Sequence, residues 1–543
     1  MKRFLLVLAL FSLGIVVIGQ TANCYRVYLN NKNNSPYSIN NPEAFLSPRA
    51  IEKRARYNIP ITTQDLPVNQ SYINQIKAYD SNIQVLSTSK WLNTVVIYCP
   101  NVAHIPGIQN LGCVQYVVPV ANFTQPAMFV PENSTGVDKF AQTSTRNYSY
   151  GNSIDQIKVH HGDSLHNRGF RGEGMLICIL DAGWEGFDTI SYFQNLYNNG
   201  QIWGTRDLIP GVNNVYTGHS HGTSVTSIIA SNIPDTLIGT APMANYFFIR
   251  SENPWSEQLI EEDFWVAGAE LADSLGADVI NSSLGYTVFA DFPEGDMTPQ
   301  QNDGITGVSS QAATIAGQKG IVVVISAGNE RESTWGYIGR PADAFDIISV
   351  AAMNKDSLIA PFSSYGPSAD GRVKPDITSV GWDTWVSTSY GSIVQGSGTS
   401  FSGPVIAGLS ACLWQSLPHL NSIELMQVIR EHGHKYNNPD NDFGYGIPDF
   451  FQAFLDNSTA IPTFDNEQNI SLYPNPANNE ITVKSSNGTI QTIQIFDVTG
   501  KMITTLNPNA DQTSININEL NSGIYFAQFT TQQSRSTIKF IKR

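Results

Sequence analysis

Three residues in the middle of the chain offer an acid, an imidazole and an alcohol, in that order along the sequence. Asp181 ends an apolar run, His221 directly precedes a helical run, and Ser400 lies in a glycine-rich turn before another helix. A serine hydroxyl is a poor nucleophile until an imidazole accepts its proton, and that imidazole needs a carboxylate to orient it. These residues therefore predict nucleophilic catalysis of acyl transfer.

Asn329 is a fourth polar residue that fits the same chemistry. It follows the apolar run 321–325, so its side-chain amide can point at an oxyanion that forms at the end of a strand. The glycines around Ser400 allow a tight turn before a helix that ends near Leu417. The positive N-terminus of such a helix also stabilises an oxyanion.

The elements that position these residues follow a regular alternation of apolar runs and helix-like stretches. A helical pattern covers residues 257–275, and a shorter one covers 224–230. The apolar runs, which we expect to be strands, are Met175–Leu180, Tyr246–Ile249, Ile321–Ile325 and Ile347–Ala351. Strands that are apolar on both faces predict a parallel sheet covered by helices on both sides, an α/β fold. Ligands of such sheets bind at the carboxyl ends of the strands.

The motifs resemble those of the subtilisin-like serine proteases. That family carries a strand-end Asp-x-Gly, a His-Gly-Thr and a Gly-Thr-Ser-x-x-x-Pro, which Asp181, His221 and Ser400 match. Further similar segments are Ala241-Pro242-Met243-Ala244, Asn281-Ser282-Ser283-Leu284-Gly285, Phe362-Ser363-Ser364-Tyr365-Gly366 and Lys374-Pro375-Asp376-Ile377. The resemblance identifies residues 147–457 as a subtilisin-like catalytic domain.

By this resemblance Asp181 orients the imidazole, His221 is general base and acid, and Ser400 attacks the substrate. Asn329 and the Ser400 backbone N–H would hold the oxyanion. The residues implied to line the substrate cleft are Ser283, Leu284, Gly285, Ser326, Ala327 and Gly328. The first three would pair with the substrate as an added strand. Tyr286 replaces a glycine of many relatives and Ala182 replaces a threonine, so the sequence leaves the shape of the pocket open.

The N-terminal region has the features of an export precursor. Lys2 and Arg3 precede an apolar run over residues 4–18, which is shorter than the roughly 20 residues of a membrane-spanning helix. We therefore expect a cleavable signal peptide over residues 1–22, with an uncleaved anchor as the alternative. Residues 23–146 predict a small α+β domain with a linker, which resembles the propeptide of exported subtilases. Such a propeptide blocks the cleft as an intramolecular inhibitor.

The C-terminal region predicts a different structure. After a linker over residues 458–469, short strands separated by Asn, Gly, Pro and Asp predict a small β-sandwich over residues 470–543. Segments such as 473–476 and 520–525, with the basic end 539–543, resemble the C-terminal sorting domain of the type IX secretion system. The resemblance implies a secreted or cell-surface protein that is recognised by the type IX machinery.

Composition and charge restrict the function further. The 31 Lys and Arg against 46 Asp and Glu give a net charge of −15, which disfavours a nucleic-acid partner.

No metal site is predicted. The histidines that lie close together in the sequence are interpreted as residues of solvated loops: His160, His161 and His166, and likewise His432 and His434. The acidic stretch 440–442 lacks the loop of an EF-hand. No cofactor is needed for the predicted chemistry, although the resemblance admits structural calcium with unassigned ligands.

The five cysteines do not predict a disulfide scaffold, although Cys99 and Cys113 could pair. Cys178 and Cys412 are interpreted as small apolar core residues.

The leading hypothesis is a secreted serine endopeptidase made as a zymogen. A surface adhesin with a vestigial protease domain is the alternative. An esterase of the α/β-hydrolase type is disfavoured because Ser400 lacks the Gly-x-Ser-x-Gly pattern and the triad order differs.

Overall fold

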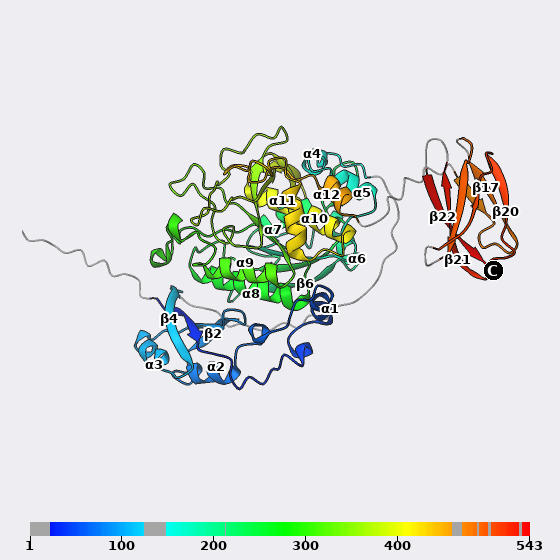
Figure 1. The fold of residues 1–543 in the computed structure, drawn as a ribbon. Helices are drawn as coiled ribbons and strands as arrows, with labels where there is room; N and C mark the ends of the chain where they lie inside the picture. The colour runs from blue at the N-terminus through cyan, green and yellow to red at the C-terminus, as the bar shows by residue number, and fades with distance from the viewer. Residues whose placement is uncertain are drawn as a thin grey trace, which may run out of the picture. The chain divides into compact units, whose positions relative to one another are not determined.

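The computed structural model describes residues 22–123, 148–211, 213–458, 470–485, 488–497, 501–530 and 535–543. The chain divides into two compact units, Met1–Asn457 and Ser458–Arg543 (Figure 1). Apart from Ala22, the predicted signal peptide lies outside the described residues, as do most of the predicted linkers. The domain boundaries of the sequence analysis therefore remain predictions.

The core of the first unit is a parallel sheet of seven strands. Its order is β13 (Ile377–Val380), β12 (Ile348–Met353), β11 (Val322–Ser326), β10 (Val279–Ser282), β5 (Leu176–Asp181), β9 (Asn245–Arg250) and β6 (Ile202–Asp207). All neighbouring pairs are parallel. The four apolar runs of the sequence became β5, β9, β11 and β12, which confirms the predicted sheet.

Helices cover both faces of this sheet (Figure 1). The helices α7 (His221–Ala230), α10 (Thr399–Ser416), α11 (Ser422–Glu431) and α12 (Phe450–Asn457) pack on one face, and α8 (Ile260–Leu275) and α9 (Val308–Gln318) pack on the other. Alternate residues of β5 enter the two cores: Ile177 and Ile179 contact the first set, and Cys178 and Leu180 contact the second. This two-sided burial is the physical reason why the strands are apolar at every position.

A smaller α+β domain precedes the catalytic region. Its antiparallel sheet has the order β2 (Gln84–Ser89), β3 (Thr94–Tyr98), β1 (Cys24–Leu29) and β4 (Val114–Ala121), with helices α1 (Pro48–Arg56), α2 (Gln70–Lys77) and α3 (Ile105–Gln109). In Figure 1 this blue domain lies against the green helices α8 and α9. The predicted α+β domain is thus present, and one face of it packs on α8.

Charged residues of α8 hold the N-terminal domain. The Arg26 guanidinium donates twice to the Asp263 carboxylate, at 2.6 and 2.7 Å, and both side chains are buried. The Glu270 carboxylate accepts hydrogen bonds from Ser89 Oγ, Lys90 N and Trp91 N at 2.6 to 2.9 Å. Because these groups are removed from water, each depends on its partner across the interface.

The second unit is a β-sandwich. One sheet contains β16 (Ile470–Tyr473), β17 (Glu480–Ser485) and β20 (Gln512–Asn516), and the other contains β19 (Met502–Leu506), β18 (Thr492–Asp497), β21 (Gly523–Thr530) and β22 (Arg535–Lys542). Ile481, Ile493 and Phe529 are among the side chains buried between the sheets. The structure confirms the predicted sandwich and adds β16 and β19, which the sequence analysis did not identify.

Two histidines correct the interpretation of solvated loops. His160 and His166 are fully buried, and each ring makes two hydrogen bonds. Burial lowers the pKa of both rings to about 4, so both are neutral structural groups. His161, between them, is exposed and pairs with Asp449 at 2.8 Å. The local sequence is polar, but the packing of α12 and of the loop at Thr240 encloses the two rings.

All five cysteines are free and buried. The pairing of Cys99 with Cys113, which the sequence left open, is therefore not formed. Cys178 and Cys412 lie in the two apolar cores, as predicted.

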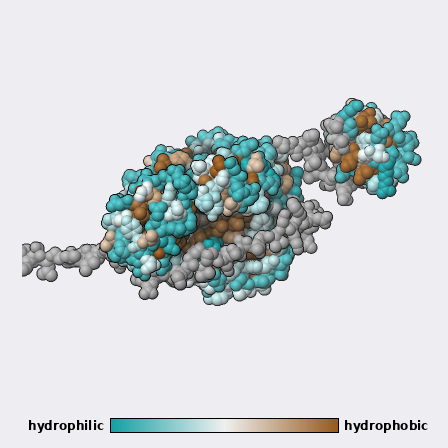
Figure 2. All heavy atoms as spheres, turned by 90° about the horizontal axis from the view of Figure 1, so that it is seen from below, coloured by the Kyte–Doolittle hydropathy of each residue, from teal (hydrophilic) through white to brown (hydrophobic). Residues whose placement is uncertain are grey.

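Figure 2 shows one face of the first unit. On the face drawn in Figure 2, hydrophilic residues cover most of the first unit, and hydrophobic ones gather in separate patches. Among the described residues, no helix combines the length and the apolar character that crossing a bilayer requires.

The buried pair on α8 gives a first prediction. Replacing Asp263 with alanine strands the Arg26 guanidinium inside the interface, which costs about 3 to 5 kcal/mol. We expect the urea midpoint of the unfolding of a Ser400→Ala precursor to fall clearly. Glu52→Ala is the control, because its ion pair with Arg56 is exposed and such pairs contribute less than about 1 kcal/mol. Equal midpoints for the two variants would contradict the importance of the buried pair.

Candidate active site

The carboxylate and the imidazole of the predicted triad are in contact. Asp181 ends β5 and is fully buried, and His221 begins α7. His221 Nδ1 lies 2.8 Å from Asp181 Oδ1, which also accepts from the Ala182 N–H at 2.8 Å. Because Nδ1 faces the acid, Nε2 is the ring nitrogen left for proton transfer.

Glycines allow this contact. The Gly222 N–H donates to the Gly183 carbonyl at 2.9 Å, which joins the start of α7 to the end of β5. A Cβ on Gly222 would lie 2.6 Å from that carbonyl oxygen, and Gly183 has a φ of +148°. Side chains at these two positions would separate the imidazole from the acid.

His219 supports the imidazole from the preceding turn. Its Nδ1 accepts a hydrogen bond from the His221 backbone N–H at 3.1 Å. His219 lacks the Gly-Thr that follows His221, so the sequence predicts a loop or substrate-side residue rather than a competing base. The His219 ring bonds to the backbone of His221, whereas the bond to the His221 ring comes from Asp181.

Ser400 lies in the first turn of α10 and is linked to Ser283 in both directions. Pro404 has no N–H, so it cannot donate to the Ser400 carbonyl as a helical residue at this position normally would. Ser283 Oγ donates to that carbonyl instead, at 3.0 Å. In return, Ser400 Oγ donates to the Ser283 carbonyl at 3.3 Å. Because of the proline, the Ser400 carbonyl is free to accept from Ser283, and this bond joins Ser400, the predicted nucleophile, to the segment after β10.

The imidazole lies beside this helical turn. The His221 ring packs on Phe401, which follows Ser400, with 6.2 Å between ring centroids. The Ser400 hydroxyl faces Ser283 rather than the ring, so proton transfer requires a rotation of its side chain. Catalytic hydrogen bonds often form only when substrate is bound.

Asn329 is oriented by Thr399. Its side-chain oxygen accepts from Thr399 N at 2.9 Å and from Thr399 Oγ1 at 3.1 Å. This leaves the amide nitrogen to donate elsewhere. A Cβ built on Gly398 would lie 3.9 Å from that nitrogen and 3.8 Å from the Ser400 N–H nitrogen. Both nitrogens therefore lie close to the same point beside Gly398.

The residues implied to bind substrate follow two neighbouring strands. Ser283, Leu284 and Gly285 come after β10, and Ser326, Ala327 and Gly328 end or follow β11. The strands are paired in register, with Ser282 opposite Ile325, so the two segments lie side by side. Gly328 N donates to Thr399 Oγ1 at 3.1 Å, which joins the second segment to α10.

Tyr286 does not fill the space between these segments. Its side chain is buried in the core under α8, where it stacks on Phe289, and its hydroxyl donates to the Glu261 carbonyl at 3.4 Å. The structure therefore answers the question that the sequence left open for this position.

Several residues of the site had no recognisable signal in the sequence. Ser283 was predicted to bind substrate, but its bonds to Ser400 were not expected, and Thr399 was not singled out for orienting Asn329. Ser251 donates its N–H to the Asp181 carbonyl at 3.1 Å, which brings the loop after β9 to the dyad. No local pattern identifies such contacts, because each one joins distant parts of the chain.

The electrostatic environment of His221 favours its charged form. Burial lowers the pKa of the imidazole, but the charge and hydrogen bond of Asp181, together with the charge of Glu252, raise it above the ordinary value of 6.5. An imidazolium formed during a reaction is thus stabilised by the protein.

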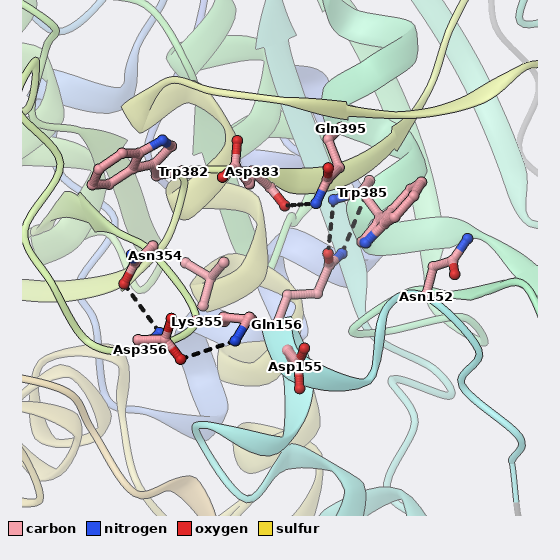
Figure 3. Close-up of a pocket in the computed structure, with 11 residues that line it drawn as sticks. Asn152, Asp155, Gln156, Asn354, Lys355, Asp356, Trp382, Asp383, Trp385 and Gln395 are labelled. Carbon is pink, nitrogen blue, oxygen red and sulfur yellow. Dashed lines mark hydrogen bonds and ion pairs between the residues drawn. The ribbon is translucent and has the colours of Figure 1, made fainter.

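A separate cavity of about 320 Å³ lies on the same domain (Figure 3). It is lined by α4 (Ile154–Lys158), the turn after β12, and the hairpin of β14 (Thr384–Ser387) and β15 (Ile393–Gly396). Gln156 accepts a hydrogen bond from the backbone of Trp385 at 3.1 Å and donates to it at 3.4 Å. None of the predicted catalytic or substrate-binding residues lines this cavity.

Across the described ranges, no group of three or more His, Cys, Asp or Glu side chains is arranged to hold a metal ion. The structure thus assigns no residues to calcium.

Comparison with known protein families covers the region that contains all four predicted catalytic residues. The model of the subtilase family matches residues 172–446, which include Asp181, His221, Asn329 and Ser400. The chain belongs to the subtilase family. It is therefore a serine endopeptidase of the subtilisin type, as the motifs predicted.

Individual subtilases align over the same region. Subtilisin BL of Lederbergia lenta is 28% identical over 268 residues, which is 49% of this chain and 86% of that protein. Subtilisin DY of Bacillus licheniformis is 29% identical over 271 residues, covering 50% of this chain and 87% of the relative. The M-protease of Shouchella clausii strain KSM-K16 is 26% identical over 298 residues, 54% of this chain and 67% of the relative.

The flanking regions match separate families. Residues 24–134 match the peptidase S8 propeptide domain of Bacteroidota, and residues 471–543 match the secretion system C-terminal sorting domain. This subtilase thus carries a propeptide and a type IX sorting domain, and the latter indicates a protein that is secreted or attached to the cell surface.

The pKa of His221 generates a prediction for the pH dependence. The imidazole must be neutral to accept a proton, and its pKa is raised, so kcat/KM should fall on the acid side with a midpoint above 6.5. The measurement uses a peptide whose side chains do not titrate between pH 5 and 9. A rate that stays constant down to pH 5 would exclude His221 as the base.

Proposed function

We propose that this subtilase hydrolyses peptide bonds through Asp181, His221 and Ser400 by way of an acyl-enzyme. The contact of 2.8 Å between Asp181 and His221, beside the first turn of α10, is the observation that carries the proposal. The buried acid holds the ring with Nδ1 turned inward, and the ring packs against the residue that follows Ser400. This arrangement supports a base next to a nucleophile at the positive end of a helix.

The reaction follows from these positions. His221 Nε2 takes the proton of Ser400 Oγ as that oxygen attacks the substrate carbonyl, and a tetrahedral oxyanion forms. The Asn329 amide and the Ser400 N–H donate to the oxyanion. The imidazolium then gives its proton to the departing amine as the peptide bond breaks. Water then attacks the acyl-enzyme while His221 accepts its proton. The ester bond to Ser400 Oγ breaks, the acid product leaves, and the imidazolium returns its proton to Ser400.

The substrate would enter as an extended strand beside Ser283, Leu284 and Gly285. An added strand satisfies its backbone groups with those of the protein, which binds peptides with little dependence on their side chains. The attacked residue (P1) would direct its side chain between this segment and Ser326, Ala327 and Gly328. Protein substrates that present an extended segment are therefore the expected class.

The propeptide is proposed to inhibit the site until it is removed. Its contacts favour this role, because Asn122, near its last described residue, donates its backbone N–H to Gln258 Oε1 at 2.7 Å. Gln258 lies in the loop between β9 and α8, the loop that Ser251 joins to Asp181. The type IX secretion machinery is the proposed partner of the C-terminal domain.

We propose that the chemistry needs no cofactor, since protein groups supply every proton and charge in the steps above. Structural calcium is a separate question of stability. Removal of metal with EDTA should leave the rate of peptide hydrolysis unchanged at low temperature. If a calcium ion stabilises the fold, EDTA should lower the melting temperature.

The decisive test is Ser400→Ala. This variant should lose proteolysis of casein and labelling by a serine-directed fluorophosphonate, because no other group supplies the attacking oxygen. Normal turnover by the variant would exclude Ser400 as the nucleophile. An exported wild-type protein that neither cleaves casein nor reacts with the probe would support the adhesin hypothesis instead.

Asn329→Ala tests the oxyanion donor. Loss of one such donor lowers kcat by roughly 10²- to 10³-fold. Asn438→Ala is the control, since Asn438 is exposed on the surface of the same domain. Equal kcat values for the two variants would remove Asn329 from the mechanism.

A further inference from the structure

The cavity between α4 and the β14–β15 hairpin has walls that the fold itself fixes (Figure 3). The buried Gln156 side chain of α4 accepts from the backbone of Trp385 at 3.1 Å and donates to it at 3.4 Å. The Trp382 N–H donates to the carbonyl of Met353, which ends β12, at 3.1 Å. The volume of about 320 Å³ is at the small end of the range of ligand pockets, about 300 to 1,000 Å³.

Two tryptophans border this cavity. Trp382 and Trp385 are both half-buried, and Trp385 lies opposite Gln395 on the same face of the hairpin. In Figure 3 the two indole rings lie on opposite sides of Asp383 and Gln395. Neither indole N–H has a hydrogen-bond partner in the part of the chain that the structure describes. The rings therefore offer apolar faces together with two free donors.

The polar side chains of the cavity supply both donors and acceptors. Asn354 Oδ1 accepts from the N–H groups of Asp356 and Leu358, at 3.0 and 2.9 Å, which leaves its amide nitrogen to donate. Gln395 donates its amide nitrogen to the Asp383 carbonyl at 3.2 Å, which leaves its Oε1 to accept. The carboxylate of Asp383 also accepts, and within the described ranges it has neither a hydrogen bond nor an ion pair.

The charges of the lining disfavour an anionic ligand. Lys355 is the one cation among the described residues that line the cavity, and it pairs with Asp356 at 2.9 Å. Asp155 and Asp383 add two further carboxylates, so a phosphate, sulfate or carboxylate group would be repelled.

The free donors disfavour a cationic ligand as well. An ammonium or guanidinium group accepts no hydrogen bond, so it would leave the two indole N–H groups and the amide of Asn354 without a partner. A hydroxyl group both donates and accepts, and a sugar carries several hydroxyl groups around a ring with an apolar C–H face. This is the ligand chemistry that matches indole faces mixed with donors and acceptors.

We propose that the cavity binds a neutral saccharide. The C–H face of a sugar ring packs on an indole, and its hydroxyl groups bond to Asp383, Asn354 and Gln395. The proposal goes beyond the protease chemistry and does not depend on Ser400. Such a site would hold the secreted protein on glycosylated material, which is either a surface polysaccharide or the glycan of a protein substrate.

The experiment measures binding of the secreted protein to immobilised oligosaccharides, after treatment with a fluorophosphonate to prevent autolysis. The surfaces carry neutral oligosaccharides of hexose and N-acetylhexosamine, sialylated and sulfated oligosaccharides, and oligoarginine as a cationic probe. We expect retention on neutral oligosaccharides. Trp382→Ala and Trp385→Ala should each raise the Kd roughly tenfold, because each removes an aromatic contact.

Asp383→Asn separates a saccharide from a cation as the ligand. Asp383 has a φ of +59°, a left-handed conformation that asparagine also adopts, so this change removes the charge and keeps the backbone. Saccharide binding should fall by less than about tenfold, because the amide oxygen still accepts. Trp255→Ala is the matched control, since its indole is 76% exposed on the same domain outside the cavity, and it should leave the Kd unchanged.

Four results would overturn the proposal: no retention on any neutral oligosaccharide, retention on charged oligosaccharides alone, retention on oligoarginine that Asp383→Asn abolishes, or an equal loss in Trp255→Ala. Competition then distinguishes the two sources of the saccharide. A neutral polysaccharide that competes indicates attachment to a surface. A glycoprotein that competes only before enzymatic removal of its glycans indicates capture of a substrate. These measurements do not require catalysis, so their failure would leave the proposed protease function intact.

Discussion

The hydrogen bond between the buried Asp181 and His221 is the interaction on which the rest of the site depends. A carboxylate without exposed surface requires a partner, and the imidazole is held at the start of α7 to provide one. Gly183 and Gly222 allow this contact, because side chains at these positions would separate the end of β5 from the start of α7. The position of the ring then determines where a nucleophile must lie, and α10 brings Ser400 to that side.

The parallel sheet places further segments beside this contact. Strands β9, β5, β10 and β11 end at the same edge of the sheet, which therefore brings together the loop of Ser251, the carboxylate of Asp181 and the two segments proposed to bind substrate. Pro404 connects the helix to this edge, because the carbonyl that it leaves free is bonded by Ser283. Ser283 therefore holds Ser400 and also belongs to the segment that is proposed to pair with the substrate.

The first unit also contains the propeptide, and α8 takes part both in the catalytic domain and in the interface with the propeptide. One face of this helix packs on the sheet, and its carboxylates bind the backbone and side chains of the propeptide. The loop that leads into α8 contacts both sides, since the Ser251 N–H donates to the Asp181 carbonyl and Gln258 accepts from Asn122 of the propeptide.

The sequence by itself predicted the sheet and the two flanking domains, and it is the source of the proposal that Asp181, His221, Ser400 and Asn329 carry the chemistry. Two-sided apolar runs and turn-forming glycines are local properties, and the motifs around the four residues are specific. Only the tertiary structure decided which polar groups are buried. His160 and His166 lie in polar sequence yet are enclosed, and Asp263 and Glu270 of α8 are buried although their local sequence does not distinguish them from solvated acids. Segments distant in the chain surround these side chains. Burial determines whether the groups are charged, and it arises only when those segments pack together.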